Sequence, residues 1–247
     1  MNIEIKEFHD LEKLSVELAK DIVDLINRTV RTRKHFSIAL SGGSTPQTLY
    51  KLLGGTYGKF IPWNSVEIFF CDERYVSPED NQSNYRMVKE NLLDLISIPQ
   101  KNIHPIPTDY SNPEEAAQTY ETELRKYFSS EGDTFDLVLL GMGKEGHTAS
   151  LFPGSPALDE KKKWAAAIEV QATPSKRITL TFPILNRASE IYFIISGADK
   201  VEALEKVARQ SASGMDGRAD FHVYPASGIL PTNGKLVWWI DQTVAVS

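Results

Sequence analysis

Residues 141–154 read GMGKEGHTASLFPG and directly follow FDLVLL, the apolar run at residues 135–140. A short, continuous apolar run of this kind is typical of a strand buried inside an α/β protein. The glycine-rich loop after it carries one histidine, His147. In an open α/β sheet, ligands bind beside the carboxyl ends of the strands. The stretch therefore predicts both a sheet and a site, with His147 as a candidate catalytic base.

Strand and helix patterns alternate on both sides of this stretch. Apolar runs predict further strands at residues 36–40, 66–71, 177–182, 190–195 and 236–240. Helical periodicity predicts helices at residues 11–30, 47–53, 80–96, 113–128 and 200–209. Such alternation is typical of a parallel sheet with crossover helices. We therefore expect a single Rossmann-like α/β domain over residues 1–247, whose one doubly wound, mostly parallel sheet has helices on both faces.

The bulk composition narrows the class of protein. The net charge of −6 argues against a general nucleic-acid-binding protein, although a local basic cluster can still bind a small anion. The one cysteine, Cys71, excludes an intramolecular disulfide and a zinc site built on several cysteines. The N-terminus shows neither a signal peptide nor a membrane helix. We expect a cytoplasmic protein, a monomer or weak dimer, with no nucleic-acid or membrane partner.

A second glycine-rich segment, SGGSTP at residues 41–46, follows the strand predicted at residues 36–40. Glycines let the backbone approach a ligand closely, hydroxyl groups donate hydrogen bonds, and a helix N-terminus presents free N–H groups. We place Thr45 as the N-cap and Pro46 as the first helical residue. The Gly-Lys-Ser/Thr of a P-loop is missing. The segment indicates either a plain tight turn or a phosphate site formed by Gly42, Gly43, Ser44 and Thr45.

Charged residues follow two other predicted strands. Asp72, Glu73 and Arg74 come directly after the run at residues 66–71. The fork of donors on an arginine can hold an oxyanion, and a neighbouring carboxylate can orient it or carry a proton. A surface salt-bridge cluster is the alternative. Lys200 lies in the first turn of its predicted helix, where a cation is unfavourable unless an anion is bound, so it points mildly to a phosphate.

Several kinds of chemistry compete for the loop at residues 141–154. Its three glycines match a dinucleotide-binding pattern and Glu160 can imitate the ribose-binding acid, but Pro153 would soon end a helix built from the loop. The histidines lack metal-ligand spacing, and no Gly-x-Ser-x-Gly motif indicates a serine hydrolase. His147 with the neighbouring Glu145 remains, and a histidine can take a proton from water near neutral pH. A histidine held for purely structural reasons is the alternative.

Five segments together resemble the 6-phosphogluconolactonases. They are SGGSTP at residues 41–46, DER at 72–74, the loop at 141–154, RITLT at 177–181 and YPAS at 224–227. The resemblance spans nearly the whole chain in the right order, and GHTASLFPG is highly specific. The related glucosamine-6-phosphate deaminases typically carry Asp-Glu-Tyr, whereas this chain has Arg74 in the third position. The chain departs from the lactonases at Glu145, where they commonly have the shorter Asp.

The resemblance implies hydrolysis of 6-phosphoglucono-1,5-lactone to 6-phosphogluconate in the oxidative pentose phosphate pathway, without a metal or an organic cofactor. It implies that His147 activates water and then protonates the leaving ring oxygen, with Glu145, Asp72 and Arg74 beside it. A glucosamine-6-phosphate deaminase and a non-catalytic sugar-phosphate sensor are the alternatives. The residues expected to bind the oxyanion are Gly143, Gly146 and Arg74, and those expected to bind the phosphate are Gly42, Gly43, Ser44, Thr45, Arg177 and Lys200.

Overall fold

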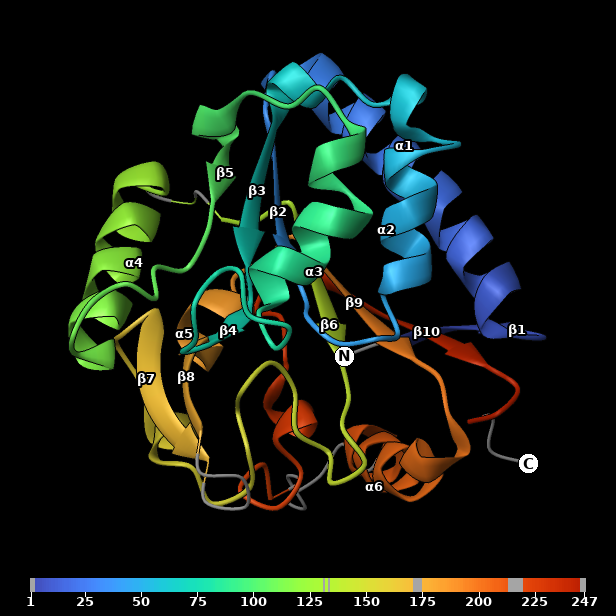
Figure 1. Cartoon of the computed structure of the whole chain (residues 1–247). Coiled ribbons are helices and arrows are strands. Elements are labelled where there is room, and N and C mark those ends of the chain that lie inside the picture. The colour runs from blue at the N-terminus through green and yellow to red at the C-terminus, as the bar shows by residue number, and fades with distance from the viewer. Residues whose placement is uncertain (1–2, 131, 133, 171–174, 213–219, 245–247) are drawn as a thin grey trace.

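The computed structural model describes residues 3–130, 132, 134–170, 175–212 and 220–244 (Figure 1). Its main element is a seven-stranded sheet in the order β1-β10-β9-β6-β2-β3-β5, and each pair of neighbouring strands is parallel. The predicted parallel α/β sheet is therefore confirmed. Its strands are β1 (Ile3–Phe8), β2 (Phe36–Leu40), β3 (Val66–Phe70), β5 (Ile103–His104), β6 (Leu137–Gly141), β9 (Glu190–Ile195) and β10 (Lys235–Asp241).

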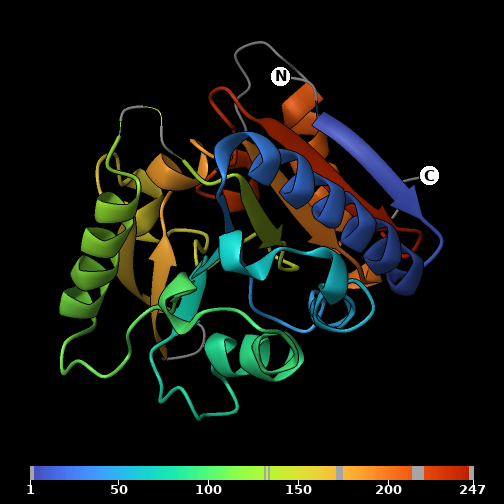
Figure 2. The same ribbon diagram turned by 90° about the horizontal axis from the view of Figure 1, so that it is seen from above.

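The helices that cover this sheet begin and end at recognisable caps. In the first helix, Asp10 accepts a hydrogen bond from Lys13 N at 2.7 Å, and Lys34 ends the helix in a left-handed conformation. Its buried face, which includes Leu14 and Ile22, packs with α2 against one side of the sheet (Figure 2). The helices are α1 (Leu11–Arg33), α2 (Gln47–Gly54), α3 (Asn84–Asn91), α4 (Pro113–Tyr127), α5 (Phe182–Leu185) and α6 (Val201–Ala212).

The central strands of the large sheet are buried on both faces. All residues of β2 and the first four residues of β6 are buried. Parallel strands covered on both faces need apolar side chains in both directions, so they read as continuous apolar runs. The sequence therefore locates β2, β3, β6, β9 and β10 to within two residues.

A second, smaller sheet corrects the prediction of one sheet. It consists of β4 (Asp72–Arg74), β8 (Ser175–Leu180) and β7 (Ala165–Val170), antiparallel in the order β4-β8-β7. The strand predicted at residues 177–182 is thus real but lies outside the large sheet. The chain passes between the sheets at Cys71, whose N–H donates to Leu40 O at 2.9 Å and whose carbonyl accepts from Leu180 N at 2.7 Å.

Two predicted helix starts were wrong. The third helix begins at Asn84 and not near Asp80, because Ser83 Oγ accepts a hydrogen bond from Arg86 N at 3.1 Å and so forms its N-cap. The second helix has Pro46 as its N-cap, with no side-chain cap bond, so Thr45 does not cap it. The Thr45 hydroxyl therefore makes no capping hydrogen bond to that helix.

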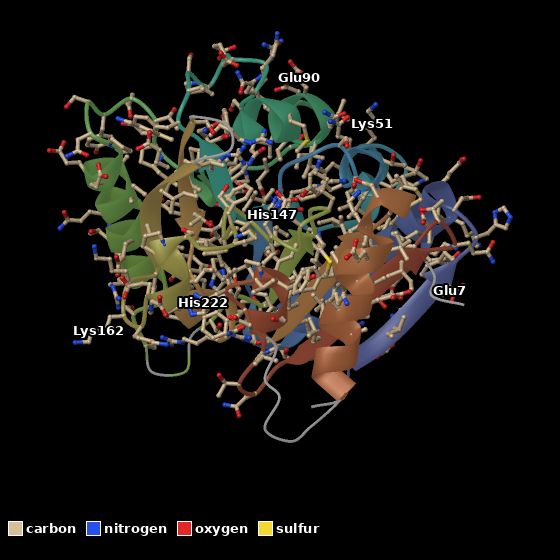
Figure 3. All side chains as sticks on the ribbon, turned by 90° about the horizontal axis from the view of Figure 1, so that it is seen from below. Glu7, Lys51, Glu90, His147, Lys162 and His222 are labelled. Atoms are coloured by element: carbon tan, nitrogen blue, oxygen red, sulfur yellow. The ribbon has the colours of Figure 1, made fainter. Side chains whose placement is uncertain are left out.

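The strand order brings three loops together at one edge. Because β6 lies between β9 and β2, their carboxyl ends are neighbours, and the loops after them carry Lys200, His147 and the segment at residues 41–46. Figure 3, seen from below, shows His147 near the middle of the molecule, with Lys162 and Glu7 far out on opposite sides. Within the described ranges, no helix is long and apolar enough to cross a membrane.

Candidate active site

The loop after β6 is shaped by its own backbone. Gly143 N donates to His147 O at 2.9 Å, and Gly146 N donates to Gly143 O at the same distance. Gly146 has a φ of 76°, in the left-handed region that favours glycine. Its carbonyl accepts from Ala226 N at 2.8 Å, which fixes the loop to the turn at Pro225–Gly228. Both glycine N–H groups expected to stabilise an oxyanion are therefore already engaged within the loop.

The ring of His147 lies where Gly143 leaves space for it. A Cβ atom on Gly143 would lie 2.1 Å from two atoms of the ring. The ring also stacks on Phe152, with centroids 4.2 Å apart and planes 26° apart. Burial lowers the pKa of His147, and this outweighs the charges of Glu145 and Asp72, which raise it. The imidazole is therefore neutral at neutral pH, as a general base must be.

Glu145 lies beside His147 without holding it firmly. Its Oε1 is 3.3 Å from His147 Nδ1, which is within ion-pair distance. The geometry is nevertheless not that of a hydrogen bond, and Nδ1 has no hydrogen-bond partner among the described residues. The Glu145 side chain is 42% exposed. The structure thus brings the two predicted residues together, while an orienting role for Glu145 stays a prediction.

Asp72 is the buried carboxylate of the site. Its Oδ2 accepts from Ser150 Oγ at 2.6 Å, and its Oδ1 accepts from Asn84 Nδ2 at 3.3 Å. Asn84 Nδ2 also donates to the Asp72 carbonyl at 2.9 Å. Sequence reasoning missed both partners, since they lie 12 and 78 residues away from Asp72. The one sequence feature that could have indicated a partner of Asp72 is that Ser150 belongs to the GHTASLFPG motif.

Glu73 connects β4 to α3 next to the site. Its Oε1 accepts the N–H groups of Arg74 and Asn84, each at 2.7 Å. Its Oε2 accepts from Tyr85 N at 2.7 Å and from Ser83 Oγ at 3.1 Å. Burial raises the pKa of Glu73, and these backbone hydrogen bonds oppose the rise. Glu73 therefore fastens the start of α3 to β4 and so positions Asn84 and Arg74.

Arg74 and Arg177 stand directly opposite each other on β4 and β8. Like charges in opposite positions destabilise a sheet. Burial lowers the pKa of Arg177, the negative charge of Asp72 opposes this fall, and the positive charge of Arg74 lowers the pKa further. Among the described residues, the buried Arg74 Nε has no hydrogen-bond partner. In the described structure, the two guanidinium groups have only neutral hydrogen-bond partners: Gln82 O, Ser150 Oγ and Ser175 Oγ. The two arginines therefore stand opposite each other without a hydrogen bond to a carboxylate in the described structure, and a role in anion binding stays a prediction.

The segment at residues 42–45 lies against the Asp72 cluster. A Cβ atom on Gly42 would lie 2.0 Å from Asn84 Oδ1, so only glycine permits this approach. Gly43 has a φ of 93°, again in the left-handed region. Ser44 is exposed and Thr45 half-buried. The segment thus adjoins the predicted catalytic carboxylate, with two hydroxyl side chains at its helix-proximal end.

Lys200 lies at the carboxyl end of β9, in a short turn (Ala198–Lys200) directly before α6. Its Nζ donates to Ser196 O at 2.7 Å and lies 3.3 Å from Asp199 Oδ1. The Lys200 ammonium group, whose position in the sequence indicated a phosphate partner, therefore already has a carbonyl and a carboxylate partner. Lys200 is therefore on the strand next to that of His147, but its contacts do not require a bound anion.

The geometry defines a class of protein. A neutral histidine and a buried aspartate lie beyond the carboxyl ends of two strands of a parallel sheet, and two arginines lie opposite each other in the small sheet that begins at this aspartate. This arrangement is typical of an α/β enzyme that acts on a small anionic substrate. In the parts of the chain that the structure describes, no three His, Cys, Asp or Glu side chains are grouped to hold a metal ion.

Within that class, the chain belongs to the glucosamine-6-phosphate isomerases/6-phosphogluconolactonase family, whose model matches residues 9–238. It is 41% identical over 220 residues to a 6-phosphogluconolactonase of Synechocystis sp., which covers 88% of this chain and 86% of the relative. Among solved structures, it is similar to the 6-phosphogluconolactonase of Thermotoga maritima, with 28% identity, a TM-score of 0.82, and 98% and 100% of the two chains covered. The Trypanosoma cruzi 6-phosphogluconolactonase gives 28% identity, a TM-score of 0.84, and coverage of 99% and 96%. The resemblance read from the motifs is confirmed.

Proposed function

We propose that the protein hydrolyses 6-phosphoglucono-1,5-lactone to 6-phosphogluconate, as a carboxylic ester hydrolase of the oxidative pentose phosphate pathway. The observation that carries the proposal is a neutral histidine within electrostatic reach of Arg177, which stands opposite Arg74. Among the described residues, the two guanidinium groups have only neutral hydrogen-bond partners. The substrate offers a phosphate and a carbonyl that becomes an oxyanion during the reaction. One base and two cations match these needs.

In the proposed mechanism, His147 takes a proton from a water molecule that attacks the lactone carbonyl. Nε2 is the atom assigned to this step, because Glu145 faces Nδ1. The carbonyl oxygen becomes an oxyanion, and the bond from the carbonyl carbon to the ring oxygen then breaks. The imidazolium returns its proton to the ring oxygen. The product is the open-chain acid, which ionises to the carboxylate.

We assign the two arginines to the two anionic parts of the substrate. Arg74 has a buried Nε–H without a hydrogen-bond partner among the described residues. This donor is proposed to bind the oxyanion in place of the N–H groups of Gly143 and Gly146, which donate within the loop. Arg177 is proposed to bind the phosphate. The further phosphate ligands proposed are Gly42, Gly43, Ser44, Thr45 and Lys200.

Replacement of the base tests the mechanism. We expect His147→Ala to lower kcat about a hundred- to ten-thousand-fold, which is what a positioned general base typically contributes. The measurement is a pH-stat assay with freshly prepared 6-phosphogluconolactone, corrected for spontaneous hydrolysis. His9→Ala is the matched control, because His9 is 81% exposed. A folded His147→Ala protein that turns over like the wild type contradicts the assignment.

The same preparation separates the alternatives. Ammonia released from glucosamine 6-phosphate, with no lactone hydrolysis, identifies a deaminase, whereas binding of 6-phosphogluconate without turnover identifies a sensor. Arg74 in the position of the deaminase tyrosine favours the lactonase. We further propose a cytoplasmic monomer or weak dimer, and the free, buried Cys71 supports a reducing compartment.

A further inference from the structure

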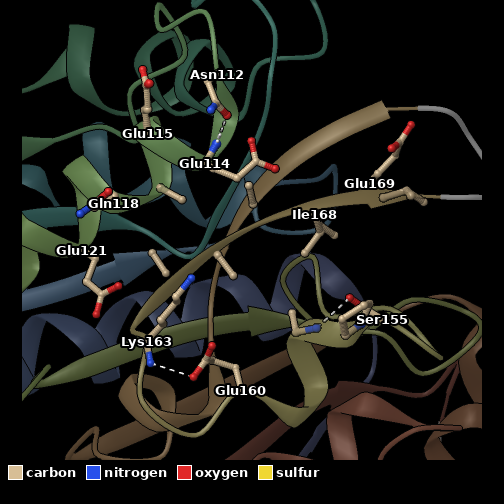
Figure 4. A pocket seen from close by; sticks show the side chains of 17 residues that line it. Asn112, Glu114, Glu115, Gln118, Glu121, Ser155, Glu160, Lys163, Ile168 and Glu169 are labelled. Atoms are coloured by element: carbon tan, nitrogen blue, oxygen red, sulfur yellow. Dashed lines mark hydrogen bonds between the residues drawn. The ribbon is translucent and has the colours of Figure 1, made fainter.

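A groove of about 1000 Å³ runs between α4 and β7. Figure 4 shows Glu114, Gln118 and Glu121 of α4 along one side and the strand with Ile168 and Glu169 along the other. The residues proposed above for catalysis and phosphate binding do not line it. The groove is therefore a second feature of the molecule, separate from the candidate active site.

The groove follows the edge of β7. All residues from Ala165 to Val170 line it. Because successive side chains of a strand point to opposite faces, a cavity over one face would meet only every second residue. A cavity lined by consecutive residues runs along the strand's edge. Among the described strands, none pairs with β7 on this side, because β7 is the terminal strand in the order β4-β8-β7.

The hydrogen-bond register shows which groups face the groove. Thr181 N donates to Trp164 O at 3.1 Å, and the ladder continues with the pairs Ala166–Thr179 and Ile168–Arg177. In an antiparallel pair, residues alternate between those bonded to the partner strand and those that point away from it. The N–H and C=O groups of the intervening residues therefore point away from β8, and these residues are Ala165, Ala167 and Glu169.

The charge of the groove selects its occupant. Five glutamates and one lysine line it, so it is strongly acidic. A second copy of this chain would bring the same glutamates to the same place, and this disfavours pairing of two β7 edges. A small cation would leave the row of main-chain groups unused. A peptide strand with basic side chains satisfies both the charges and the main-chain groups.

We propose that the β7 edge is the docking site for an extended, lysine- or arginine-rich segment of a partner protein. The segment adds to the small sheet next to β7. Its main chain pairs with Ala165, Ala167 and Glu169, and its basic side chains meet the glutamates of α4, above all Glu114. Main-chain pairing supplies affinity in such complexes, while the side-chain contacts supply specificity.

Fluorescence anisotropy with a labelled Thr-Lys-Thr-Lys-Thr-Lys-Thr peptide tests the proposal. We expect the wild type to bind this peptide and not its Glu counterpart. Glu114→Lys with Glu169→Lys should raise the Kd about tenfold or more, because two attractive charge contacts become repulsive. Ala167→Pro should also raise it about tenfold, because it removes an outward N–H without touching the ladder to β8. Circular dichroism checks that each variant is folded.

A matched control and a modified peptide complete the test. Glu7→Lys with Asp24→Lys makes the same change of net charge at exposed residues outside the groove, and it should leave the Kd unchanged. A peptide N-methylated at alternate residues should bind more weakly, which tests strand pairing without any protein variant. The proposal is overturned if the wild type does not bind the lysine peptide, or if the control variant weakens binding equally. It is also overturned if N-methylation and Ala167→Pro leave the Kd unchanged, since the groove then attracts any cation.

Discussion

The neutral state of His147 depends on the ring that covers it. Phe152 stacks on the imidazole, and burial is the main cause of the lowered pKa of His147. The proposed mechanism needs the unprotonated ring, so kcat/KM should fall on the acid side with a midpoint below the ordinary value of 6.5. We expect Phe152→Ala to admit water and move this midpoint to higher pH. The pH profile of kcat/KM measures the shift.

The control for this experiment is Phe60→Ala, since Phe60 is 54% exposed and lies outside the site. The Arg177 guanidinium carbon also lies 5.3 Å from the centroid of the Phe152 ring. The substitution should therefore change the maximum value of kcat/KM as well as the midpoint of the pH profile. The midpoint alone reports the protonation of His147. An acid limb that stays in place, or that moves to lower pH, means that Phe152 does not set the pKa of the base.

Sequence reasoning identified candidate reactive side chains but not the residues that support them. His147, Asp72 and Arg74 were marked by their places directly after apolar strands. Asn84 and Ser150 were not, because their contacts with Asp72 exist only once α3 and the histidine loop are folded against β4. The glycine pattern also does not reveal that Gly143 N and Gly146 N donate within the loop, so the choice among the predicted oxyanion donors stays a prediction.

One histidine outside the site joins three elements. His104 on β5 contacts Glu67 of β3 through Nε2 at 2.9 Å and Glu123 of α4 through Nδ1 at 2.6 Å. Burial lowers the pKa of His104, but the hydrogen bonds to the two glutamates outweigh it and raise the pKa overall. Its protonation therefore stabilises the fold below the unfolded pKa, and the stabilisation is lost as pH rises through the folded value.

We expect His104→Gln to destabilise the protein by about 1–3 kcal/mol at low pH, where the charged hydrogen bonds are intact. The difference from the wild type should shrink as the solution becomes alkaline. Urea unfolding at several pH values measures it, and His9→Gln is the control at an exposed histidine. A difference that is constant with pH, or that grows in alkali, would mean that His104 is not a charged link between α4 and the sheet.

The elements that the sequence missed are those that depend on neighbours. β7 begins with three alanines, which have low strand propensity, and it forms because β8 pairs with it and α4 packs against it. β5 is two residues long and extends β3. By contrast, the buried strands of the large sheet have apolar side chains on both faces. Such strands can be read from local sequence, whereas strands held by a partner cannot.

The whole molecule is built so that two sheets meet at the candidate site. The large sheet presents His147 and the segment at residues 42–45, whereas the small sheet presents Arg74 and Arg177. A ligand that contacts both groups links the sheets, and any ligand that binds only the folded state stabilises it. The opposed arginines repel each other, and an anion bound between them would relieve this repulsion. Ligand binding and global stability should therefore be coupled through Arg177.

We expect 6-phosphogluconate, at about a hundred times its Kd, to stabilise the fold by about 2.7 kcal/mol. For a chain of this size the melting temperature should then rise by roughly 5–10 °C. Arg177→Ala should remove most of this rise in melting temperature and should increase KM more than it lowers kcat. Without ligand, its melting temperature should stay near that of the wild type, because relief of the arginine repulsion offsets the lost contacts. Differential scanning calorimetry gives the temperatures, and Lys176→Ala is the control, since Lys176 is the exposed neighbour on β8. If Arg177→Ala keeps the full rise with ligand and an unchanged KM, the anion is bound elsewhere and the two sheets are not joined by the substrate.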